Sequence, residues 1–201
     1  GIDIEVRVNN RKILDGMMDV LKIALEKRGD LILAIDKLDK KSRKEVEEEI
    51  YALGIKREVF AKLFAVLSLK GSNSIILEEI AGFVGENEGI VEMRELLAYC
   101  PEKNVVFVPS LARGLAYYTG SIFEVYGQGS TVNSALASGG RYDKMIGAFL
   151  GGAQEYPAVG CSFGLDRIFA VVAEKRKQKV KSVVQVFVVP IGVSLNTVWP
   201  L

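Results

Sequence analysis

The start of the chain alternates apolar and charged side chains without a break. In residues 2–8 every second residue is isoleucine or valine, and an aspartate, a glutamate or an arginine stands between them. Because successive side chains of a strand point to opposite faces, this pattern predicts a half-buried strand with one wet face. The charges Glu5, Arg7 and Arg11 face either a cleft or plain solvent, and both interpretations are open.

Helical spacing follows the opening strand. Asn9 and Asn10 suit a turn and a helix N-cap. Leucine and methionine then recur three or four residues apart in residues 14–25, and Gly29 is a typical residue at which a helix ends. The sequence therefore predicts one helix from the cap to Gly29.

Residues 30–100 have a different character, because apolar residues recur there at helical spacing in several short runs. The predicted helices include residues 60–67, 75–83 and 91–99, separated by glycines. A basic run opens this part of the chain: Lys37, Lys40, Lys41, Arg43 and Lys44. The run either contacts phosphates or solvates a helix face, which charge runs commonly do.

Strand patterns return in the second half of the chain. Residues 104–108, 122–126, 132–137 and 159–163 are predicted strands, residues 144–150 and 165–173 predicted helices, and residues 185–190 a last strand. Together with the first half this predicts an α+β fold, in which an antiparallel sheet carries an inserted all-helical subdomain.

One stretch concentrates groups that can bind a ligand. Residues 111–124 read Leu-Ala-Arg-Gly-Leu-Ala-Tyr-Tyr-Thr-Gly-Ser-Ile-Phe-Glu. Arg113 is a permanent cation that can hold a carboxylate or a phosphate through two parallel hydrogen bonds. If the stretch is extended, Tyr117 and Tyr118 point to opposite faces, one into the core and one into a pocket. The alternative is an edge strand with a surface arginine and two core aromatics.

Three motifs resemble histidyl-tRNA synthetases, which are class II aminoacyl-tRNA synthetases. Arg-Gly-Leu-Ala-Tyr-Tyr-Thr-Gly with the following Phe-Glu resembles the first histidine-specific motif of that family. Residues 138–143, Ser-Gly-Gly-Arg-Tyr-Asp, resemble the second, and residues 157–168 resemble class II motif 3. The motifs stand in the family's order, and residues 30–100 resemble the insertion domain of archaeal and eukaryotic-type members.

The resemblance implies a division of the chain into four parts. Residues 1–29 would be the catalytic strand and helix that follow motif 2, and residues 30–100 the helical insertion domain. Residues 101–182 would carry the two histidine motifs and motif 3, and residues 183–201 would be the start of the anticodon-binding domain.

The resemblance also implies roles for individual residues. Arg113 would contact the histidine carboxylate and the α-phosphate region as an electrostatic catalyst. The histidine-binding residues would be Tyr117, Tyr118, Gly139, Gly140 and Tyr142. Gly160, Gly164 and Arg167 would bind ATP, and the basic run from Lys37 to Lys44 would contact tRNA. Arg167 could instead be a snorkelling surface arginine, and Arg141 could be functional or make a structural salt bridge.

The implied activity is that of a histidine–tRNA ligase, which activates histidine with ATP and Mg²⁺ and transfers it to tRNA(His). No tightly bound cofactor is expected, and the full-length protein is expected to be a homodimer. Motifs 1 and 2 are not found, so we expect a fragment with little or no aminoacylation activity by itself. The alternative is a non-catalytic regulatory or tRNA-binding relative.

Two positions depart from the family's pattern. Ala116 stands where the family usually has aspartate before the tyrosine pair, which removes a carboxylate near the pocket. Asp166 replaces the usual glutamate before the motif 3 arginine, which keeps the charge and shortens its reach.

Composition excludes several kinds of protein. The chain has no histidine, so a histidine-ligated metal and histidine-based catalysis are excluded, and no metal site is predicted. The net charge of +1 means that a tRNA partner would need a local basic patch. No apolar run approaches the ~20 residues of a membrane span. Cys100 and Cys161 are far apart, which predicts free buried thiols and a cytoplasmic location.

Overall fold

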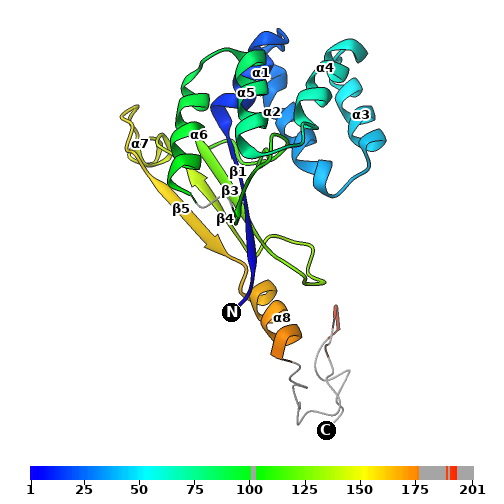
Figure 1. Cartoon of the computed structure of the whole chain (residues 1–201), viewed down its shortest axis with the longest axis vertical. Helices are drawn as coiled ribbons and strands as arrows, with labels where there is room; N and C mark the ends of the chain where they lie inside the picture. Colours follow the sequence, from blue (N-terminus) through cyan, green and yellow to red (C-terminus); the bar gives the residue numbers. More distant parts are fainter. Residues whose placement is uncertain (101–102, 177–188, 190, 194–201) are drawn as a thin grey trace.

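The computed structural model describes residues 1–100, 103–176, 189 and 191–193. A five-stranded sheet runs through this part of the chain in the order β2-β1-β3-β4-β5. Figure 1 shows helices α1 to α6 gathered at one end of the sheet, while α8 extends from the other end, near the N-terminus. The fold is therefore α+β, as the sequence predicts.

The sheet is mixed, not wholly antiparallel. Strand β1 (Ile4–Asn10) pairs in parallel with β2 (Val105–Phe107) and antiparallel with β3 (Ser121–Gly127). Strand β4 (Ala137–Arg141) joins β3 to β5 (Val159–Phe163), again antiparallel. The opening strand is confirmed, and its register places Arg7 opposite Glu124 on the face that carries the polar side chains.

The predicted helix up to Gly29 is wrong, because the chain turns earlier. Helix α1 (Arg11–Val20) begins at Asn10, whose side chain accepts a hydrogen bond from the backbone of Lys12, as the sequence predicts. The helix ends before a turn in which Lys22 has a φ of 56°, a left-handed conformation. Helix α2 (Leu25–Ile35) then runs through Gly29. Both helices bury the same kind of apolar face, so the periodicity does not reveal the turn.

The helices of residues 30–100 form as predicted, and side-chain caps explain most of their starts. The helices are α3 (Arg43–Ala52), α4 (Arg57–Leu67), α5 (Asn73–Val84) and α6 (Glu88–Tyr99), and the 3₁₀ helix η1 (Asp36–Asp39) precedes them. Ser42, Ser72 and Asn87 each accept a hydrogen bond from the first turn of the following helix. In α3 the N-cap and Glu45 form a capping box.

One buried apolar cluster joins these helices to the sheet. It includes Leu14 and Met17 of α1, Phe60 of α4, and Val8 and Phe107 of β1 and β2. Helix α6 packs on β1 and β3, and α5 packs on β2 and α1. Helices α5 and α6 thus connect the helical part of the chain to the sheet. The division of the chain at residues 30 and 100 stays a prediction.

In the second half of the chain one predicted strand is wrong and one lies mostly outside the described residues. The strand predicted at residues 132–137 is wrong, because β4 starts at Ala137 and runs through the glycine pair. These glycines fit there because a side chain at Gly139 would strike the Gly160 carbonyl, 2.0 Å from its Cβ position. Helix α7 (Met145–Phe149) and helix α8 (Leu165–Arg176) lie where the sequence predicts them. The predicted strand 185–190 lies outside the described residues, apart from residue 189.

Candidate functional site

The loop before β3 is shaped by the end of β1. Asn9 is fully buried and donates hydrogen bonds to the carbonyls of Pro109 and Leu111, at 2.9 and 2.8 Å. Arg113 follows with a φ of 49°, a left-handed conformation that is unusual for a residue with a side chain. The stretch from Leu111 to Gly120 is thus a loop and not an extended strand, which corrects one sequence expectation. The loop turns Arg113 back over the sheet.

The Arg113 guanidinium meets the carboxylate of Glu124 on β3. Nη1 of Arg113 lies 2.5 Å from Oε1 of Glu124, and the two side chains are only 20% and 13% exposed. The Tyr126 hydroxyl donates to the other oxygen of Glu124 at 2.7 Å. Burial opposes the charge of the guanidinium, but Glu124 and Tyr118 outweigh it and raise the pKa of Arg113. Arg113 is therefore a fixed cation.

One N–H donor of this cation is not used in any hydrogen bond among the described residues. Nε of Arg113 is buried and has no hydrogen-bond partner among the described residues. A buried unpaired N–H costs free energy, so such an atom in a site is a natural place for an acceptor oxygen. A carboxylate or phosphate oxygen would satisfy it.

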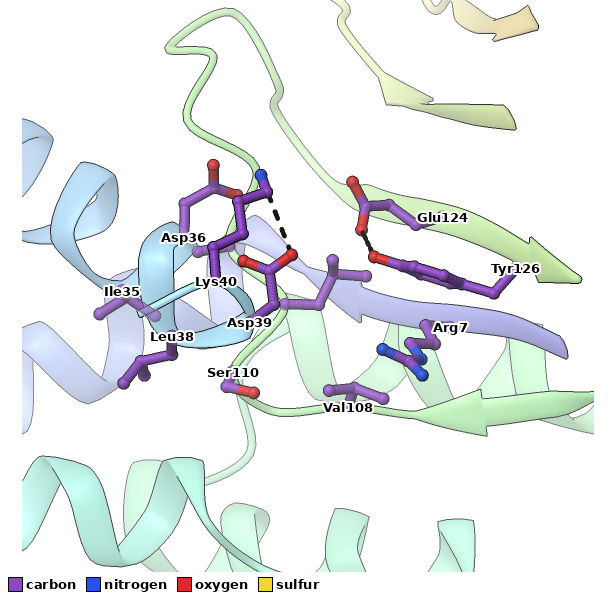
Figure 2. A pocket seen from close by; sticks show the side chains of 12 residues that line it. Arg7, Ile35, Asp36, Leu38, Asp39, Lys40, Val108, Ser110, Glu124 and Tyr126 are labelled. Carbon is purple, nitrogen blue, oxygen red and sulfur yellow. Dashed lines mark hydrogen bonds and ion pairs between the residues drawn. The ribbon is translucent and has the colours of Figure 1, made fainter. Parts of the chain in front are cut away.

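Glu124 also lines a polar cavity of about 190 Å³, and Figure 2 shows the residues around it. Its wall includes Arg7 and Tyr126 from the sheet, Asp39 and Lys40 from the η1 turn, and Glu124. The Arg7 guanidinium lies 4.1 Å from the centre of the Tyr126 ring. Burial raises the pKa of Asp39. Cations and carboxylates in one small cavity suit a ligand that carries both charges.

The η1 acids are site candidates that the sequence reasoning missed. Asp36 and Asp39 stand inside an apolar helical pattern, and nothing local marks them as cavity residues. The sheet side of the cavity was accessible to reasoning, because alternation puts Arg7, Glu124 and Tyr126 on one face once the register is known. Of the two interpretations of Arg7, the structure supports the cleft.

The three tyrosines form a connected group. The rings of Tyr117 and Tyr118 lie 4.6 Å apart, and those of Tyr117 and Tyr142 lie 6.1 Å apart and nearly perpendicular. Tyr118 is 6% exposed and Tyr117 39%, so one is buried and the other open to solvent. They do not point to opposite faces of a strand, because the loop brings the rings together. The Arg113 guanidinium carbon lies 5.9 Å from the Tyr118 ring centre.

Glycines of the motifs make room for these rings. A side chain at Gly140 would place its Cβ 2.8 Å from the Tyr118 ring, and one at Gly160 would come within 2.6 Å of the Tyr142 hydroxyl. Neither contact is possible for a real Cβ. Gly140 and Gly160 are also register partners across β4 and β5. The two strands therefore support the tyrosine group from below.

Arg167 lies apart from this group. It is in the first turn of α8, exposed, and it donates to the Ala135 carbonyl at 2.8 Å. Gly164 sits directly before the helix, and a Cβ there would approach Cδ of Arg167 to 3.1 Å. Gly164 and Arg167 lie side by side, and no contact of Arg167 with Arg113 or with the tyrosines occurs within the described residues. The ATP-binding role of Arg167 stays a prediction.

The basic run divides into paired and unpaired cations. Lys37 and Lys41 each meet Glu49 at 2.6 Å, and Lys40 lies 3.9 Å from Asp39. The Arg43 guanidinium lies 4.0 Å from the centre of the Phe64 ring. Lys44 is exposed, and no ion pair of it occurs within the described residues. The run is therefore a weaker positive patch than its composition indicates.

The described part of the chain contains no cluster of metal-ligating side chains. No group of three or more cysteine, aspartate or glutamate side chains there is placed to hold a metal ion. None of the helices in residues 1–100 and 103–176 is both long and apolar enough to cross a membrane. Cys161 is exposed, which corrects the expectation of two buried thiols, and Cys100 is partly buried.

Comparison with known proteins shows which family has this arrangement of residues. The model of the family described as histidyl-tRNA synthetase matches residues 2–168, which include the Arg113 loop, the tyrosines and the start of α8. The chain belongs to the histidyl-tRNA synthetase family.

Individual relatives agree with the family model. Histidine–tRNA ligase 1 of Bacillus cereus is 34% identical over 200 residues, which cover 97% of this chain and 47% of the relative. The crystal structure of histidyl-tRNA synthetase from Nostoc sp. PCC 7120 superposes with a TM-score of 0.76 at 30% identity, over 87% of this chain and 43% of that one. The chain thus spans less than half the length of either of these two relatives.

A third match has the same fold and carries a different name. An ATP phosphoribosyltransferase regulatory subunit/histidyl-tRNA synthetase from Bacillus halodurans C superposes with a TM-score of 0.66 at 24% identity, over 85% of this chain and 45% of that one. At this identity the likeness shows the fold alone. The expectation that the chain is of the archaeal or eukaryotic type stays a prediction.

Proposed function

We propose that this chain supplies the histidine-binding half of a histidine–tRNA ligase. The observation that carries the proposal is the Arg113–Glu124 pair, in which Nε of Arg113 is buried without a partner among the described residues and Glu124 lines a polar cavity. Histidine has a carboxylate, an ammonium group and a neutral imidazole, so its site must offer both charges and a ring partner. The cavity offers both charges, and Arg113 and the tyrosine group, which do not line it, would provide the carboxylate and ring contacts.

Arg113 would bind the carboxylate of histidine. Glu124 holds Nη1, so the remaining donors of the guanidinium keep a fixed direction. A fixed cation also serves the activation step, because negative charge develops where the carboxylate attacks the α-phosphate of ATP. In this role Arg113 stabilises charge and transfers no proton.

Acidic groups of the cavity would receive the ammonium group. Asp39 and Glu124 both line it, and Lys40 and Arg7 keep it from being purely acidic. The imidazole would lie against the tyrosine group, since phenol hydroxyls can accept from its N–H or donate to its bare nitrogen. The glycines Gly139 and Gly140 would let the backbone approach the ligand.

The ATP and tRNA sites belong to the proposal as well. Arg167 and the α8 N-terminus next to Gly164 would hold the γ-phosphate of ATP with its Mg²⁺. Gly160 would leave room for the nucleotide. Lys40 and Lys44 would contact tRNA(His) phosphates, and a cytoplasmic homodimer would be the working form.

A binding experiment tests the histidine site most simply, because it needs no turnover. Isothermal titration with histidine should show binding, and titration with histidinol should show it weakened about tenfold or more, because histidinol lacks the carboxylate. Phenylalanine, which keeps the carboxylate but lacks the imidazole, serves as the ring control. Equal affinity for histidine and histidinol would refute the assignment of Arg113.

A second candidate function is a non-catalytic relative that binds a ligand or tRNA without activating histidine. Ala116 favours it, because the aspartate that the resemblance leads us to expect at this position is absent. The open hollow lined by Ala116, Tyr117 and Phe149 is mostly apolar. Histidine binding together with pyrophosphate exchange would exclude this candidate, whereas tRNA binding without histidine binding would support it.

A further inference from the structure

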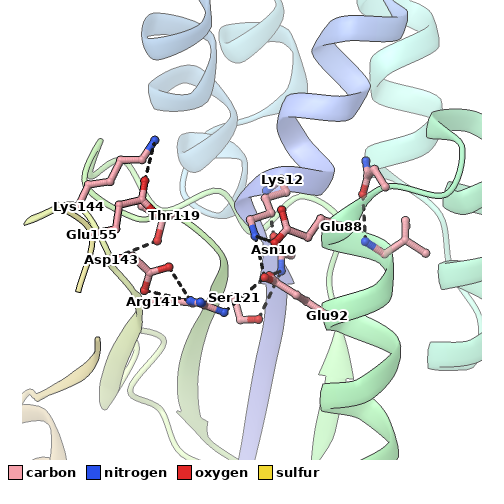
Figure 3. A network of polar contacts seen from close by, with 12 residues as sticks. Asn10, Lys12, Glu88, Glu92, Thr119, Ser121, Arg141, Asp143, Lys144 and Glu155 are labelled. Carbon is pink, nitrogen blue, oxygen red and sulfur yellow. Dashed lines mark hydrogen bonds and ion pairs between the residues drawn. The ribbon is translucent and has the colours of Figure 1, made fainter. Parts of the chain in front are cut away.

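A polar network joins three parts of the chain (Figure 3). At its centre is Glu92 of α6, whose side chain is 16% exposed. Oε2 of Glu92 accepts from Nδ2 of Asn10 at 2.7 Å, and Oε1 accepts from Nζ of Lys12 at 2.7 Å. Nη1 of Arg141 reaches the same oxygen at 3.4 Å. One carboxylate thus binds the end of β1, the start of α1 and the end of β4.

Arg141 carries the network toward Tyr142. Its Nε donates to both oxygens of Asp143, at 3.0 and 2.7 Å. Asp143 in turn accepts from the backbone of Ala158, and its own N–H donates to the Thr119 hydroxyl. The residue between Arg141 and Asp143 is Tyr142, so both of its neighbours are held by side chains.

The backbone around Tyr142 is fixed from both sides. Its N–H donates to the Ala158 carbonyl at 2.9 Å, and the Arg141 carbonyl accepts from the Thr119 backbone at 2.8 Å. Arg141 also passes close to Gly120, where a Cβ would lie 3.1 Å from Cδ of Arg141 and 3.2 Å from Oε2 of Glu92. A side chain at position 120 would therefore crowd both Arg141 and Glu92.

The charges make Glu92 the partner that Lys12 and Arg141 share. Lys12 also meets Glu88 at 2.8 Å, but Glu88 is 73% exposed. Burial opposes the charge of Lys12, and the hydrogen bonds of Glu88 and Glu92 outweigh it, so the pKa of Lys12 is raised. Without the Glu92 carboxylate, two cations would face each other in a partly buried place, which is unfavourable.

We infer that Glu92 is a positioning residue for Tyr142, which it holds in the histidine site through Arg141. The meaning for histidine rests on the proposed function. The coupling runs from a helix within the predicted insertion to a residue of the second histidine motif, so the state of α6 sets the place of a ring that meets the ligand. Glu92 itself touches no part of the cavity that Arg7 and Glu124 line.

The first experiment needs no ligand. In protein with ¹³C-labelled tyrosine rings, the signal of Tyr142 is identified by its loss in Tyr142→Phe. The isosteric change Glu92→Gln should shift or broaden that signal and leave the signal of Tyr51, on α3, in place. Glu95→Gln, an exposed change on the same helix, should move neither. An unmoved Tyr142 signal in folded Glu92→Gln would overturn the inference, whether or not the chain binds histidine.

A double-mutant cycle separates positioning from a general loss of structure. Glu92→Gln should weaken histidine binding about tenfold, the value of a lost charged hydrogen bond. In an Arg141→Gln background it should have no further effect on affinity or on the Tyr142 signal, because the link is already cut. Additive effects would contradict the inference, and absence of histidine binding by the unsubstituted chain would contradict only the proposed function. If Glu92→Gln fails to fold, Arg141→Gln alone must move the Tyr142 signal.

Discussion

Arg113 and Glu124 form an ion pair at 2.5 Å between a loop residue in a left-handed conformation and the middle of a strand. The pair defines the direction of the cation, because Glu124 is itself held by the Tyr126 hydroxyl. The loop and the strand are thus tied together at the point where the ligand is expected.

Glu124→Gln should destabilise the protein and disorder the cation. The pair is mostly buried, so we expect the free energy of unfolding to fall by about 1–2 kcal/mol, less than for a fully buried pair. Urea denaturation measures this. Glu5→Gln is the control, because it breaks the ion pair with Arg7, which is more exposed than the Arg113–Glu124 pair. It should cost about 0.5 kcal/mol or less. Equal losses of unfolding free energy in the two variants would show that the Arg113–Glu124 pair contributes no more to stability than an exposed ion pair.

Gly140→Ala should disrupt the tyrosine group. The new Cβ would lie 2.7 Å from the Ser121 carbonyl and 2.8 Å from the Tyr118 ring, and the backbone carbonyl is held in the sheet. Such overpacking costs about 1–3 kcal/mol. Gly82→Ala is the matched change, because Gly82 lies within α5 and a Cβ there meets nothing within 4 Å. It should stabilise by about 0.5–1 kcal/mol, and thermal unfolding distinguishes the two signs.

Glu49→Gln should strengthen binding of tRNA. Glu49 neutralises both Lys37 and Lys41, so its removal releases two cations for phosphate contacts. Filter binding at several salt concentrations should show a higher affinity and a steeper salt dependence. Glu48→Gln removes the same charge from an exposed position on α3 and should have a smaller effect. Identical effects would mean that the basic run only solvates its helix.

Asp15→Asn should stabilise the protein at neutral pH and not in acid. Burial raises the pKa of Asp15, and Arg11 and Arg28 oppose the shift only in part. A carboxyl with a raised folded-state pKa loses stability as pH rises from its unfolded pKa through its folded one. Below that window both states are protonated and the carboxyl has no effect. We expect about 0.5 kcal/mol at pH 7 after solvent screening, and none near pH 3.

Urea denaturation at the two pH values measures the difference. Asp30→Asn, at an exposed position of α2, is the control for the general change in net charge. A gain for Asp15→Asn that is the same at both pH values would contradict the assigned cause.

Local signals explain which parts of the fold the sequence predicts. Strand β1 follows from strict alternation, and α4, α5 and α6 follow from apolar residues at helical spacing with glycines between the runs. The end of α1 was missed because Lys22, and not a glycine, adopts the left-handed conformation in the turn that follows the helix. Strand β4 was misplaced because its glycines have no β propensity and are set by packing against Tyr118 and Phe123.

The site residues also differ in whether local sequence signals reveal them. Arg113 and the tyrosines could be named from their motifs, but their geometry depends on residues far away in the chain. Asn9 shapes the loop from β1, the sheet register brings Glu124 under Arg113, and the η1 turn places Asp39 at the cavity. Glu92, some fifty residues from Arg141, follows no pattern that a single sequence displays. Long-range contacts of this kind appear only once the fold is known.

The central claim is that Arg113 holds the carboxylate of histidine, and a cycle of two ligands and two proteins tests it directly. Histidine and histidinol are titrated into the unsubstituted chain and into Arg113→Gln. We predict that the unsubstituted chain prefers histidine about tenfold or more and that Arg113→Gln binds both ligands equally weakly. If Arg113→Gln keeps the preference for histidine, the claim is contradicted.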